Sequence, residues 1–436
     1  MNTNTDTPTN TPKNTTITKN KNKKNNFFYL HFDLNLNLNY DYLLDNRYLQ
    51  LVIYNGTRVI DKCYMRRIHY MCKYSKPKNI KYKIDNNKYI DLECMDKSSM
   101  RPIHFICQYS TPEIIKYIID KEVDLECADK CSMRPIHYIC QYSTPEMIKY
   151  IIDKEVDLDC ADNCSMRPIH YICKHSTPAM IKYIIDKSVD LECMDKYDTR
   201  PIHYICKHST HEIIKYIIDK GVDLECTEQS SMRPIHYICK DSTPETIKYI
   251  IDKGVDLECM DKFSMRPIHY ICQYSTPEMI KYIIDKGVAL ESMDKYSMRP
   301  IHYICKYSTP EMIKYIIDKG VDLECMDQDS MRPIHYICQY STPEMLKYII
   351  DKGVELDCMD QHSMRPIHYI CQYSTPEMIK YIIDKDVDLE CKNKYNKYPI
   401  YYIKRYSTRE MVQYIKKVIY KKRKGYRKYV PIMFNF

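Results

Sequence analysis

The sequence contains no tryptophan and only seven glycines among its 436 residues. A loop that holds phosphate groups depends on closely spaced glycines, and the runs GxGxxG, GxxxxGK[ST], GxSxG and HExxH are all absent. No stretch approaches 18 uninterrupted apolar residues, and no signal-peptide pattern opens the chain. These absences argue against nucleotide-binding enzymes and membrane-spanning proteins. We expect an intracellular, cytoplasmic protein without membrane contact.

Cysteine is abundant, with 22 residues, but its arrangement does not match the usual cysteine-based sites. No CxxC pair occurs, which argues against zinc ribbons and thioredoxin-like redox centres. Disulfide frameworks are typical of short secreted domains, whereas these cysteines recur at fixed places in a long chain. We therefore expect reduced thiols.

The formal net charge of +8 is distributed unevenly along the chain. Residues 1–98 carry 17 Lys and Arg against 9 Asp and Glu, and residues 392–436 carry 14 against one acid, Glu410. Residues 99–391 carry 35 basic against 48 acidic residues. An acidic central region is therefore flanked by basic ends.

A recurring histidine marks an internal period. From His104 to His368 it returns every 33 residues, together with its neighbours, as in MDKYSMRPIHYICKYSTPEMIKYIIDKGVDLEC at 293–325. Tyr401 stands at the histidine position of the last unit. The period predicts eleven units between residues 61 and 424. Units of this size bury a core only when they stack side by side.

Each unit carries the start signals of two short helices. The first is Pro135, which the first helical turn tolerates, followed by Ile136, Ile139 and Cys140 at helical spacing. The second is the run STPE at 143–146, with a hydroxyl cap and a carboxylate that the helix dipole favours. The apolar stripe of the second helix then consists of Met147, Ile148, Ile151 and Ile152.

The second helix ends at a position that favours a left-handed residue. Five of the seven glycines occupy it, and Glu122, Glu155, Ser188 or Asp386 stands there in other units. A residue with a Cβ costs about 1 kcal/mol relative to glycine in this conformation. We predict that the units between residues 200 and 358 are the most stable. Their glycines are Gly221, Gly254, Gly287, Gly320 and Gly353.

The repeat resembles the ankyrin repeat, whose familiar run is D-x-x-G-x-T-P-L-H-x-A-A followed by G-A-D. The matching residues are DKYSMRPIHYIC at 294–305 and Gly320-Val321-Asp322. The resemblance implies an all-α ankyrin-repeat solenoid of about eleven 33-residue helix-turn-helix units with short extended turns. Arginine replaces the family's threonine before the proline, Ile-Cys replaces Ala-Ala, and serine often replaces both structural glycines. The composition and this form of the repeat resemble the large ankyrin sets of giant DNA viruses of amoebae, which implies a viral protein.

Ten units place a histidine three residues before a cysteine, as in His302 and Cys305. Zinc needs four ligands at about 2.0–2.3 Å, whereas neighbouring helices lie about 8–10 Å apart, so successive pairs do not converge on one ion. An enzyme needs a nucleophilic Cys–His pair only once, in its active site. Ten copies at the same spacing indicate that the pair has a structural role. By the resemblance, the histidine bridges adjoining turns and the cysteine fills a space between helices. We expect no enzyme activity, metal or cofactor; metal-dependent folding is the alternative.

Two positions vary widely among the units: the turn tip and the end of the first helix. By the resemblance, partners meet these positions. We expect them, with the nearly invariant methionine beside the tip, to form a protein-binding strip, because aromatic side chains are frequent hot spots. The alternative is that these two positions vary because they face solvent and bind nothing. The candidate partner-binding residues are Tyr197, Phe263, Tyr296, His362, Met265, Met298, Tyr274 and Tyr307.

The ends of the chain differ from the repeats in composition. Residues 1–26 are rich in Asn, Thr and Lys, which predicts a disordered tail. Residues 27–60 contain apolar clusters, which predict a segment that caps the first unit. Residues 425–436 form a basic and aromatic C-terminal tail.

A compact basic run lies just before this tail. It has two explanations: the polar outer face of a capping helix, or a contact with nucleic acid or the nuclear import machinery. Our main expectation is a monomeric, non-catalytic scaffold that binds an unidentified protein of a host cell. The alternative is a nuclear-addressed or nucleic-acid-contacting factor. The basic run consists of Lys421, Lys422, Arg423 and Lys424.

Overall fold

The computed structural model describes residues 67–87 and 89–429, and the expected segments 1–26 and 27–60 lie outside these ranges. The described chain is all-helical, as predicted, and its 22 helices form eleven pairs. The first helices of the pairs are α2 (Arg67–Tyr74), α4 (Pro102–Tyr109), α6 (Pro135–Tyr142), α8 (Pro168–His175), α10 (Pro201–His208), α12 (Pro234–Asp241), α14 (Pro267–Tyr274), α16 (Pro300–Tyr307), α18 (Pro333–Tyr340), α20 (Pro366–Tyr373) and α22 (Pro399–Tyr406). The second helices are α3 (Pro77–Asn86), α5 (Pro112–Ile119), α7 (Pro145–Ile152), α9 (Pro178–Asp186), α11 (His211–Asp219), α13 (Pro244–Asp252), α15 (Pro277–Asp285), α17 (Pro310–Asp318), α19 (Pro343–Asp351), α21 (Pro376–Ile383) and α23 (Arg409–Tyr429).

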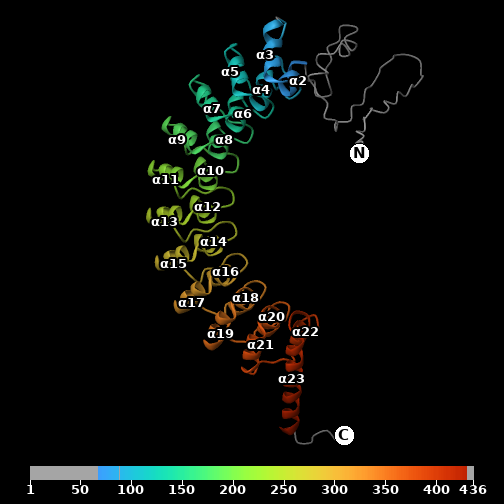
Figure 1. The fold of residues 1–436 in the computed structure, drawn as a ribbon. Coiled ribbons are helices and arrows are strands. Elements are labelled where there is room, and N and C mark those ends of the chain that lie inside the picture. The colour runs from blue at the N-terminus through green and yellow to red at the C-terminus, as the bar shows by residue number, and fades with distance from the viewer. Residues whose placement is uncertain (1–66, 88, 430–436) are drawn as a thin grey trace, which may run out of the picture.

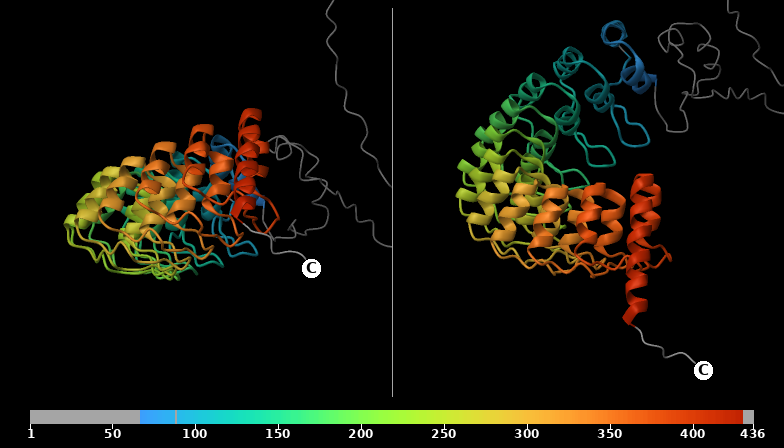
Figure 2. Two further views of the ribbon diagram at one scale, coloured as in Figure 1. Left: turned by 90° about the horizontal axis from the view of Figure 1, so that it is seen from below. Right: turned by 60° about the horizontal axis from the view of Figure 1, so that its bottom comes forward.

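The helix pairs stack side by side into an arc (Figure 1). The first helices and the projecting turns line the inner, concave side, and the second helices form the outer, convex side. Figure 2 shows the turns following one another along one edge of the arc. Helix α23 is longer than the others and projects beyond the array, so it passes through residue 424, where we placed the end of the repeats.

Both kinds of helix begin as the sequence indicates. The hydroxyl of Thr144 accepts a hydrogen bond from the backbone N–H of Met147 at 3.4 Å, which caps the second helix. In the first helix, the backbone N–H of Arg299 donates to Nδ1 of His302 at 2.9 Å. The histidine side chain therefore fixes the residue that precedes the proline through its backbone N–H, a contact that does not depend on the side chain at that position.

One hydrophobic core runs through the whole array. Ile304 of a first helix and Ile313 and Ile316 of the following second helix are fully buried, and their counterparts recur in the other repeats. Burying a side chain of this size contributes about 1.5–3 kcal/mol, so stacking of the repeats supplies most of the cohesion.

Two positions adopt left-handed backbone conformations in most of the described repeats. The stop of the second helix does so as predicted, with φ of 81° at Gly320 and 58° at Ser188. A Cβ built on Gly320 would meet no atom within 4 Å, so the backbone conformation alone favours glycine there. The second position follows the turn tip, where Ser297 has a φ of 58°. The predicted higher stability of residues 200–358 stays a prediction.

Arginine side chains link successive repeats. The guanidinium of Arg299 pairs with Glu291 of the preceding segment and with Asp322 of the next repeat, the latter at 3.2 Å. Equivalent bridges recur in most repeats from Arg101 to Arg365. The arginine that departs from the family pattern therefore joins neighbouring repeats through their acidic segments.

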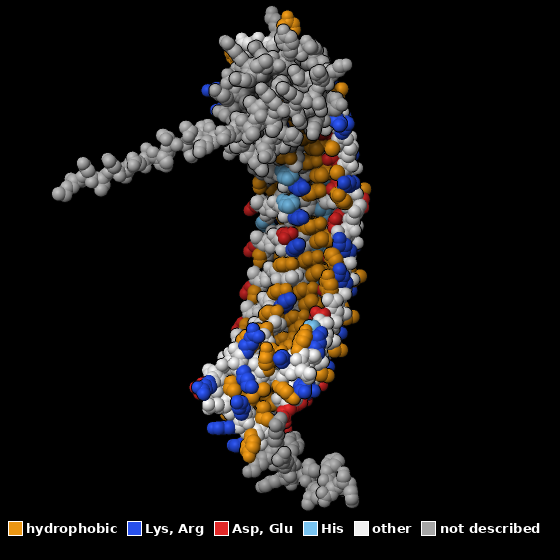
Figure 3. Space-filling view, turned by 90° about the vertical axis from the view of Figure 1, so that its right-hand side faces the viewer, with side chains coloured by type: hydrophobic (Ala, Val, Ile, Leu, Met, Phe, Trp, Pro, Cys, Tyr) orange, Lys and Arg blue, Asp and Glu red, His pale blue; other side chains and the backbone are white. Residues whose placement is uncertain are grey.

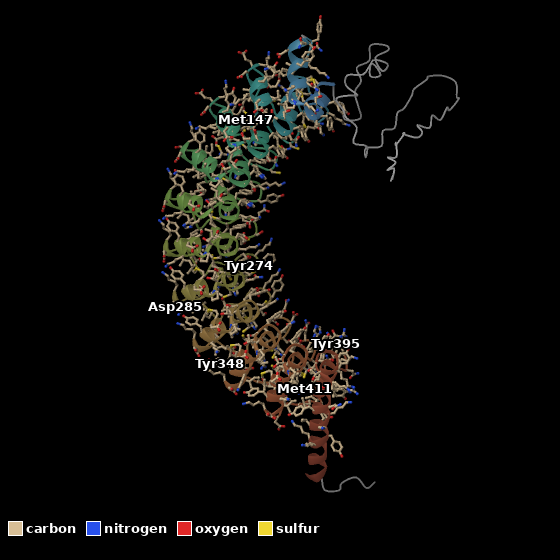
Figure 4. All side chains as sticks on the ribbon, viewed as in Figure 1. Met147, Tyr274, Asp285, Tyr348, Tyr395 and Met411 are labelled. Atoms are coloured by element: carbon tan, nitrogen blue, oxygen red, sulfur yellow. The ribbon has the colours of Figure 1, made fainter. Side chains whose placement is uncertain are left out.

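A second polar ladder runs along the convex side. The hydroxyl of Tyr348 donates to Asp318 of the preceding repeat at 3.1 Å, and Lys314 lies over the Tyr348 ring at 5.3 Å. A similar contact with Tyr315 lowers the pKa of Asp285, mainly through the hydrogen bond. Figure 4 places Tyr348 and Asp285 on the convex side. The convex tyrosines from Tyr117 to Tyr381 are therefore committed, with their aspartates and lysines, to contacts between repeats.

Candidate interaction surface

The recurring histidines are structural. His302 is fully buried, its Nδ1 accepts the Arg299 N–H, and its Nε2 lies 3.3 Å from the backbone carbonyl of Cys325 in the following turn. Burial lowers the pKa of His302, so the neutral ring with a proton on Nε2 fits both contacts. Both ring nitrogens are occupied, which leaves neither for a metal or a substrate.

The cysteines of the first helices are also packing residues. Cys305 is buried, and its burial raises the pKa of the thiol, which disfavours the thiolate that nucleophilic chemistry needs. The sulfur of Cys325 lies near His302 instead, with Sγ 3.7 Å from Nε2. Within residues 67–87 and 89–429, no group of three or more His, Cys, Asp and Glu side chains could hold a metal ion.

A half-buried or buried aspartate organises most of the projecting turns. One carboxylate oxygen of Asp294 accepts the backbone N–H groups of Tyr296 and Met298 at 2.8 and 2.9 Å. The other accepts the hydroxyl of Tyr303 at 2.7 Å. The carbonyl of Tyr296 then accepts the backbone N–H of Gln328 in the next turn at 2.9 Å. The backbone of the tip is therefore fixed on both sides, while the tip side chain stays available.

The predicted tip residues lie on these fixed turns. Tyr197 and Tyr296 are 50% and 40% exposed, whereas Phe263 and His362 are half-buried. Lys295 reaches across two tips, with its Nζ 3.9 Å from the ring centroid of Phe263 and 4.8 Å from that of Tyr296. The tips thus present aromatic rings with lysines over them.

The predicted methionines are less accessible than the tips. Met265 and Met298 are half-buried and pack against the core, and their counterpart Met364 is 8% exposed. The methionine position therefore has a packing role that the sequence pattern did not reveal. Only the outer part of Met265 and of Met298 is available to a partner.

The two predicted helix-end tyrosines, Tyr274 and Tyr307, lie half-exposed on the concave side. Figure 4 shows Tyr274 on that side. Tyr274 stacks on Tyr270 of the same helix with ring centroids 6.5 Å apart, and Tyr307 stacks on Tyr303 at 6.4 Å. The inner tyrosines bond to the buried aspartates, so the outer rings rest on fixed supports.

These two tyrosines belong to a longer series that sequence reasoning missed. The i, i+4 spacing of the aromatic residues was the signal that could have revealed it. The concave face viewed in Figure 3 shows a band of hydrophobic side chains, interrupted by lysines and histidines. We call the C-terminal part of the series the tyrosine stripe; it consists of Tyr274, Tyr307, Tyr340, Tyr373 and Tyr406, each 48–51% exposed.

The basic run has a partly structural role. Lys422 donates to a carboxylate oxygen of Asp386 at 2.7 Å and to the carbonyl of Val387 at 3.4 Å, which ties α23 to the preceding repeat. Lys421 is exposed. Arg423 and Lys424 lie on the same helix, and their side chains fall outside the described part of the structure.

The comparisons with known proteins agree with this architecture. A family model described as "Ankyrin repeats (3 copies)" matches residues 68–162, 136–228, 235–327, 301–393 and 334–424. No curated protein matches the chain. Among the described residues, no helix combines the length and hydropathy needed to cross a lipid bilayer. Because the matched segments cover well over half of the chain, the protein belongs to the ankyrin-repeat family.

Proposed function

We propose that the protein is a non-catalytic scaffold that binds a protein partner on its concave face, through the turn tips and the exposed side of the first helices. Ankyrin repeats are in general protein-interaction scaffolds. One observation carries the proposal for this surface. The aromatic side chains of the concave face are half-exposed on a backbone fixed by buried aspartates, whereas the convex tyrosines are bonded between repeats.

Fixed aromatic side chains suit protein recognition. A tyrosine contributes a large contact area and loses little conformational freedom on binding, and hot spots are enriched in tyrosine. Tyr197, Phe263 and Tyr296 supply such rings at the tips, and Tyr274 and Tyr307 supply them on the helices. His362, Met265 and Met298 extend the surface with half-buried side chains.

The same proposal covers the origin of the protein and of its partner, and the place where they meet. The composition and the form of the repeat support a viral protein that meets a host partner in the cytoplasm and acts as a monomer. The large hydrophobic side chains exposed along the concave face support binding there rather than drift on a solvated surface.

The test compares two triple variants in affinity capture from the native cell. The first changes Tyr197, Phe263 and Tyr296 to Ser, and we expect it to lose the partner that the wild type retains. The control changes three convex tyrosines of nearby repeats to Ser and should keep the partner. Equal recovery by the wild type and the tip variant contradicts the proposal. Circular dichroism melting checks that both variants fold. The control residues are Tyr216, Tyr249 and Tyr282.

The alternative function places the contact on α23. The exposure of Lys421 and the projection of α23 beyond the array support contact with nucleic acid or the import machinery. Changing Lys417 and Lys421 to Glu leaves the Lys422 contact with Asp386 intact. Loss of heparin retention and of nuclear signal in this variant would favour the alternative, and unchanged behaviour would exclude it.

A further inference from the structure

The last repeat has one side of its core that no further repeat covers. Helices α22 and α23 form the end of the arc (Figure 1). Ile400 of α22 is half-buried, whereas its counterparts Ile301 and Ile367 in earlier repeats are only 1% and 2% exposed. In a solenoid, the next repeat normally covers such a position. Ile400 therefore lies on an end face that the described residues leave partly open.

Part of this end face is adapted to water. Lys404 and Lys416 are exposed, and they take the places that the buried Cys371 and Ile383 have in the preceding repeat. Charged side chains at these two places keep the end of the solenoid soluble. Ile400 and the half-buried Ile419 remain apolar, so covering the surface between them is favourable.

An open groove lies between α22 and α23 at this end face. Its volume is about 270 Å³, and it is lined by Ile400, Lys416, Ile419 and Tyr420. The three lining residues of α23 are spaced i, i+3 and i+4, so they share one face of the helix. Ile419 takes the place of the left-handed residue that stops the earlier second helices, such as Gly353. Helix α23 therefore continues past the groove, and Tyr420, which is 66% exposed, forms its outer wall.

The segment that follows α23 has a composition that suits this groove. Residues 430–436, which lie outside the described ranges, have the sequence VPIMFNF, and all of them except Asn435 are apolar. Phe434 and Phe436 are two of the seven phenylalanines in the chain. The preceding run KKVIYKKRKGYRKY at 416–429 is strongly basic, so the apolar segment is distinct from it. Burial of its large side chains is favourable.

The same segment is long enough to reach the groove. Pro431 has no backbone N–H, and a residue before proline avoids the helical conformation, which agrees with the end of α23 at Tyr429. Along the helix, Ile419 and Tyr420 lie about 14–15 Å before this end, at about 1.5 Å per residue. From Tyr429, an extended chain spans up to about 17 Å to Phe434 and about 23 Å to Phe436. Both phenylalanines can therefore reach the groove.

We propose that residues 430–436 fold back along α23 and close the end of the array, with the rings of Phe434 and Phe436 packed against Ile400, Ile419 and Tyr420. Lys416 places an ammonium group beside these rings, as Lys319 does for Tyr315, where Nζ lies 5.1 Å from the ring centroid. The segment thus takes the part of a further repeat for this side of the core. The inference is independent of the proposed function, because it concerns the end of the array and not the concave face.

A single tryptophan tests the proposal in the full chain. The sequence contains none, so Phe434→Trp introduces one fluorophore. We expect blue-shifted emission, and acrylamide quenching about threefold weaker than in a free peptide of residues 427–436 with the same change, because the ring is shielded from water. Quenching equal to that of the peptide overturns the proposal. Shielding that is lost on dilution, together with a dimer mass in light scattering, overturns it in favour of a second copy that holds the segment.

Variants of the groove locate the contact of the tryptophan. In the Phe434→Trp chain, Tyr420→Ser and Ile419→Ala should each raise the quenching by about twofold, because they remove apolar surface from the groove. Tyr406→Ser is the matched control, since Tyr406 is 51% exposed on α22 and does not line the groove, and it should leave the quenching unchanged. Circular dichroism melting checks that the variants fold. Unchanged quenching in both groove variants contradicts the proposal.

Hydrogen exchange tests the same contact without tryptophan. Changing Phe434 and Phe436 together to Ser in the full chain should make the amides of residues 416–420 exchange about tenfold faster, because the groove face of α23 loses its cover. The amides of α20 should not change. Equal exchange of residues 416–420 in the wild type and the double variant contradicts the proposal.

Discussion

Arg266 forms an ion pair with Glu258 of the preceding segment but meets no carboxylate of the next repeat, where Ala289 takes the place of an aspartate. The equivalent Arg233 and Arg299 each bridge two carboxylates. The junction between α14 and α16 therefore has one fewer polar link than its neighbours.

We predict that Ala289→Asp stabilises the array. The new carboxylate would pair with Arg266, as Asp256 pairs with Arg233 at 3.2 Å. Because both groups are partly exposed, the gain should be about 0.2–1 kcal/mol. Urea unfolding at low and high salt provides the measurement, and the gain should shrink in high salt.

The matched control for this substitution is Ala289→Asn. It has nearly the same shape without the charge and should not reproduce the salt-dependent gain. A stability change of the same size in both variants would contradict the ion-pair explanation.

Glycine at the helix stop should stabilise the N-terminal repeats. Ser188 has a φ of 58°, a conformation in which a residue with a Cβ is strained. We predict that Ser188→Gly raises the free energy of unfolding by about 1 kcal/mol, and that Ser188→Ala brings no gain. Chemical denaturation measures both variants. A gain with alanine as large as that with glycine would show that the backbone conformation is not the cause.

Hydrogen exchange tests the related prediction for the whole array. Amides of the repeats between residues 200 and 358, which hold the five glycines at the helix stop, should exchange more slowly than those of residues 102–186. Uniform exchange rates along the array would contradict it.

The second repeat lacks one of the contacts that the turn aspartate makes in other repeats. Asp96 accepts the backbone N–H groups of Ser98 and Met100, but Phe105 occupies the position where Tyr303 donates its hydroxyl to Asp294. We predict that Phe105→Tyr stabilises the chain by about 0.5–1.5 kcal/mol and that Tyr303→Phe destabilises it by about 1–2 kcal/mol. Thermal and urea unfolding measure both. Equal signs for the two changes would contradict this role of the hydroxyl.

Stability should fall when the pH drops below about 7. Burial lowers the pKa of nine first-helix histidines in the folded chain, while in the unfolded chain the pKa is about 6.5. The unfolded state therefore binds more protons. As the pH falls, the free energy of unfolding decreases by roughly 1.4 kcal/mol per pH unit for each histidine in the cooperative unit.

Urea midpoints at pH 7.5, 6.5 and 5.5 measure this effect. The convex aspartates whose pKa is lowered by tyrosine hydrogen bonds, such as Asp252, lose their stabilisation only near pH 4 and below, so they do not contribute in this window. A midpoint at pH 5.5 equal to or above that at pH 7.5 would contradict the prediction.

The sequence predicted the fold because its signals are local and repeated. Pro135, the STPE run and the glycine stop each specify a helix end, and the 33-residue period specifies the stacking. The contacts between repeats were not predictable in the same way. The pairing of Arg299 with Asp322 and the hydrogen bond of Tyr303 to Asp294 depend on how neighbouring turns meet in space.

Only part of the candidate surface was predictable from the sequence, because the rest also depends on how neighbouring repeats meet in space. Variation among the repeats pointed to Tyr296 and Tyr307, because positions with little packing duty vary most. It did not reveal that Met298 is partly packed into the core, nor that Tyr307 continues through Tyr340 and Tyr373 as one stripe. Those facts follow from burial and ring stacking, which only the three-dimensional arrangement determines.

Lysine footprinting of the full chain, alone and with a captured partner, tests most directly whether the concave face is the binding surface. An acetylating reagent should modify Lys262, Lys295 and Lys306 of the concave side less when the partner is bound. The convex lysines Lys281 and Lys314 should react equally in both states. Protection of the convex lysines with unchanged reactivity of the concave ones would contradict the account.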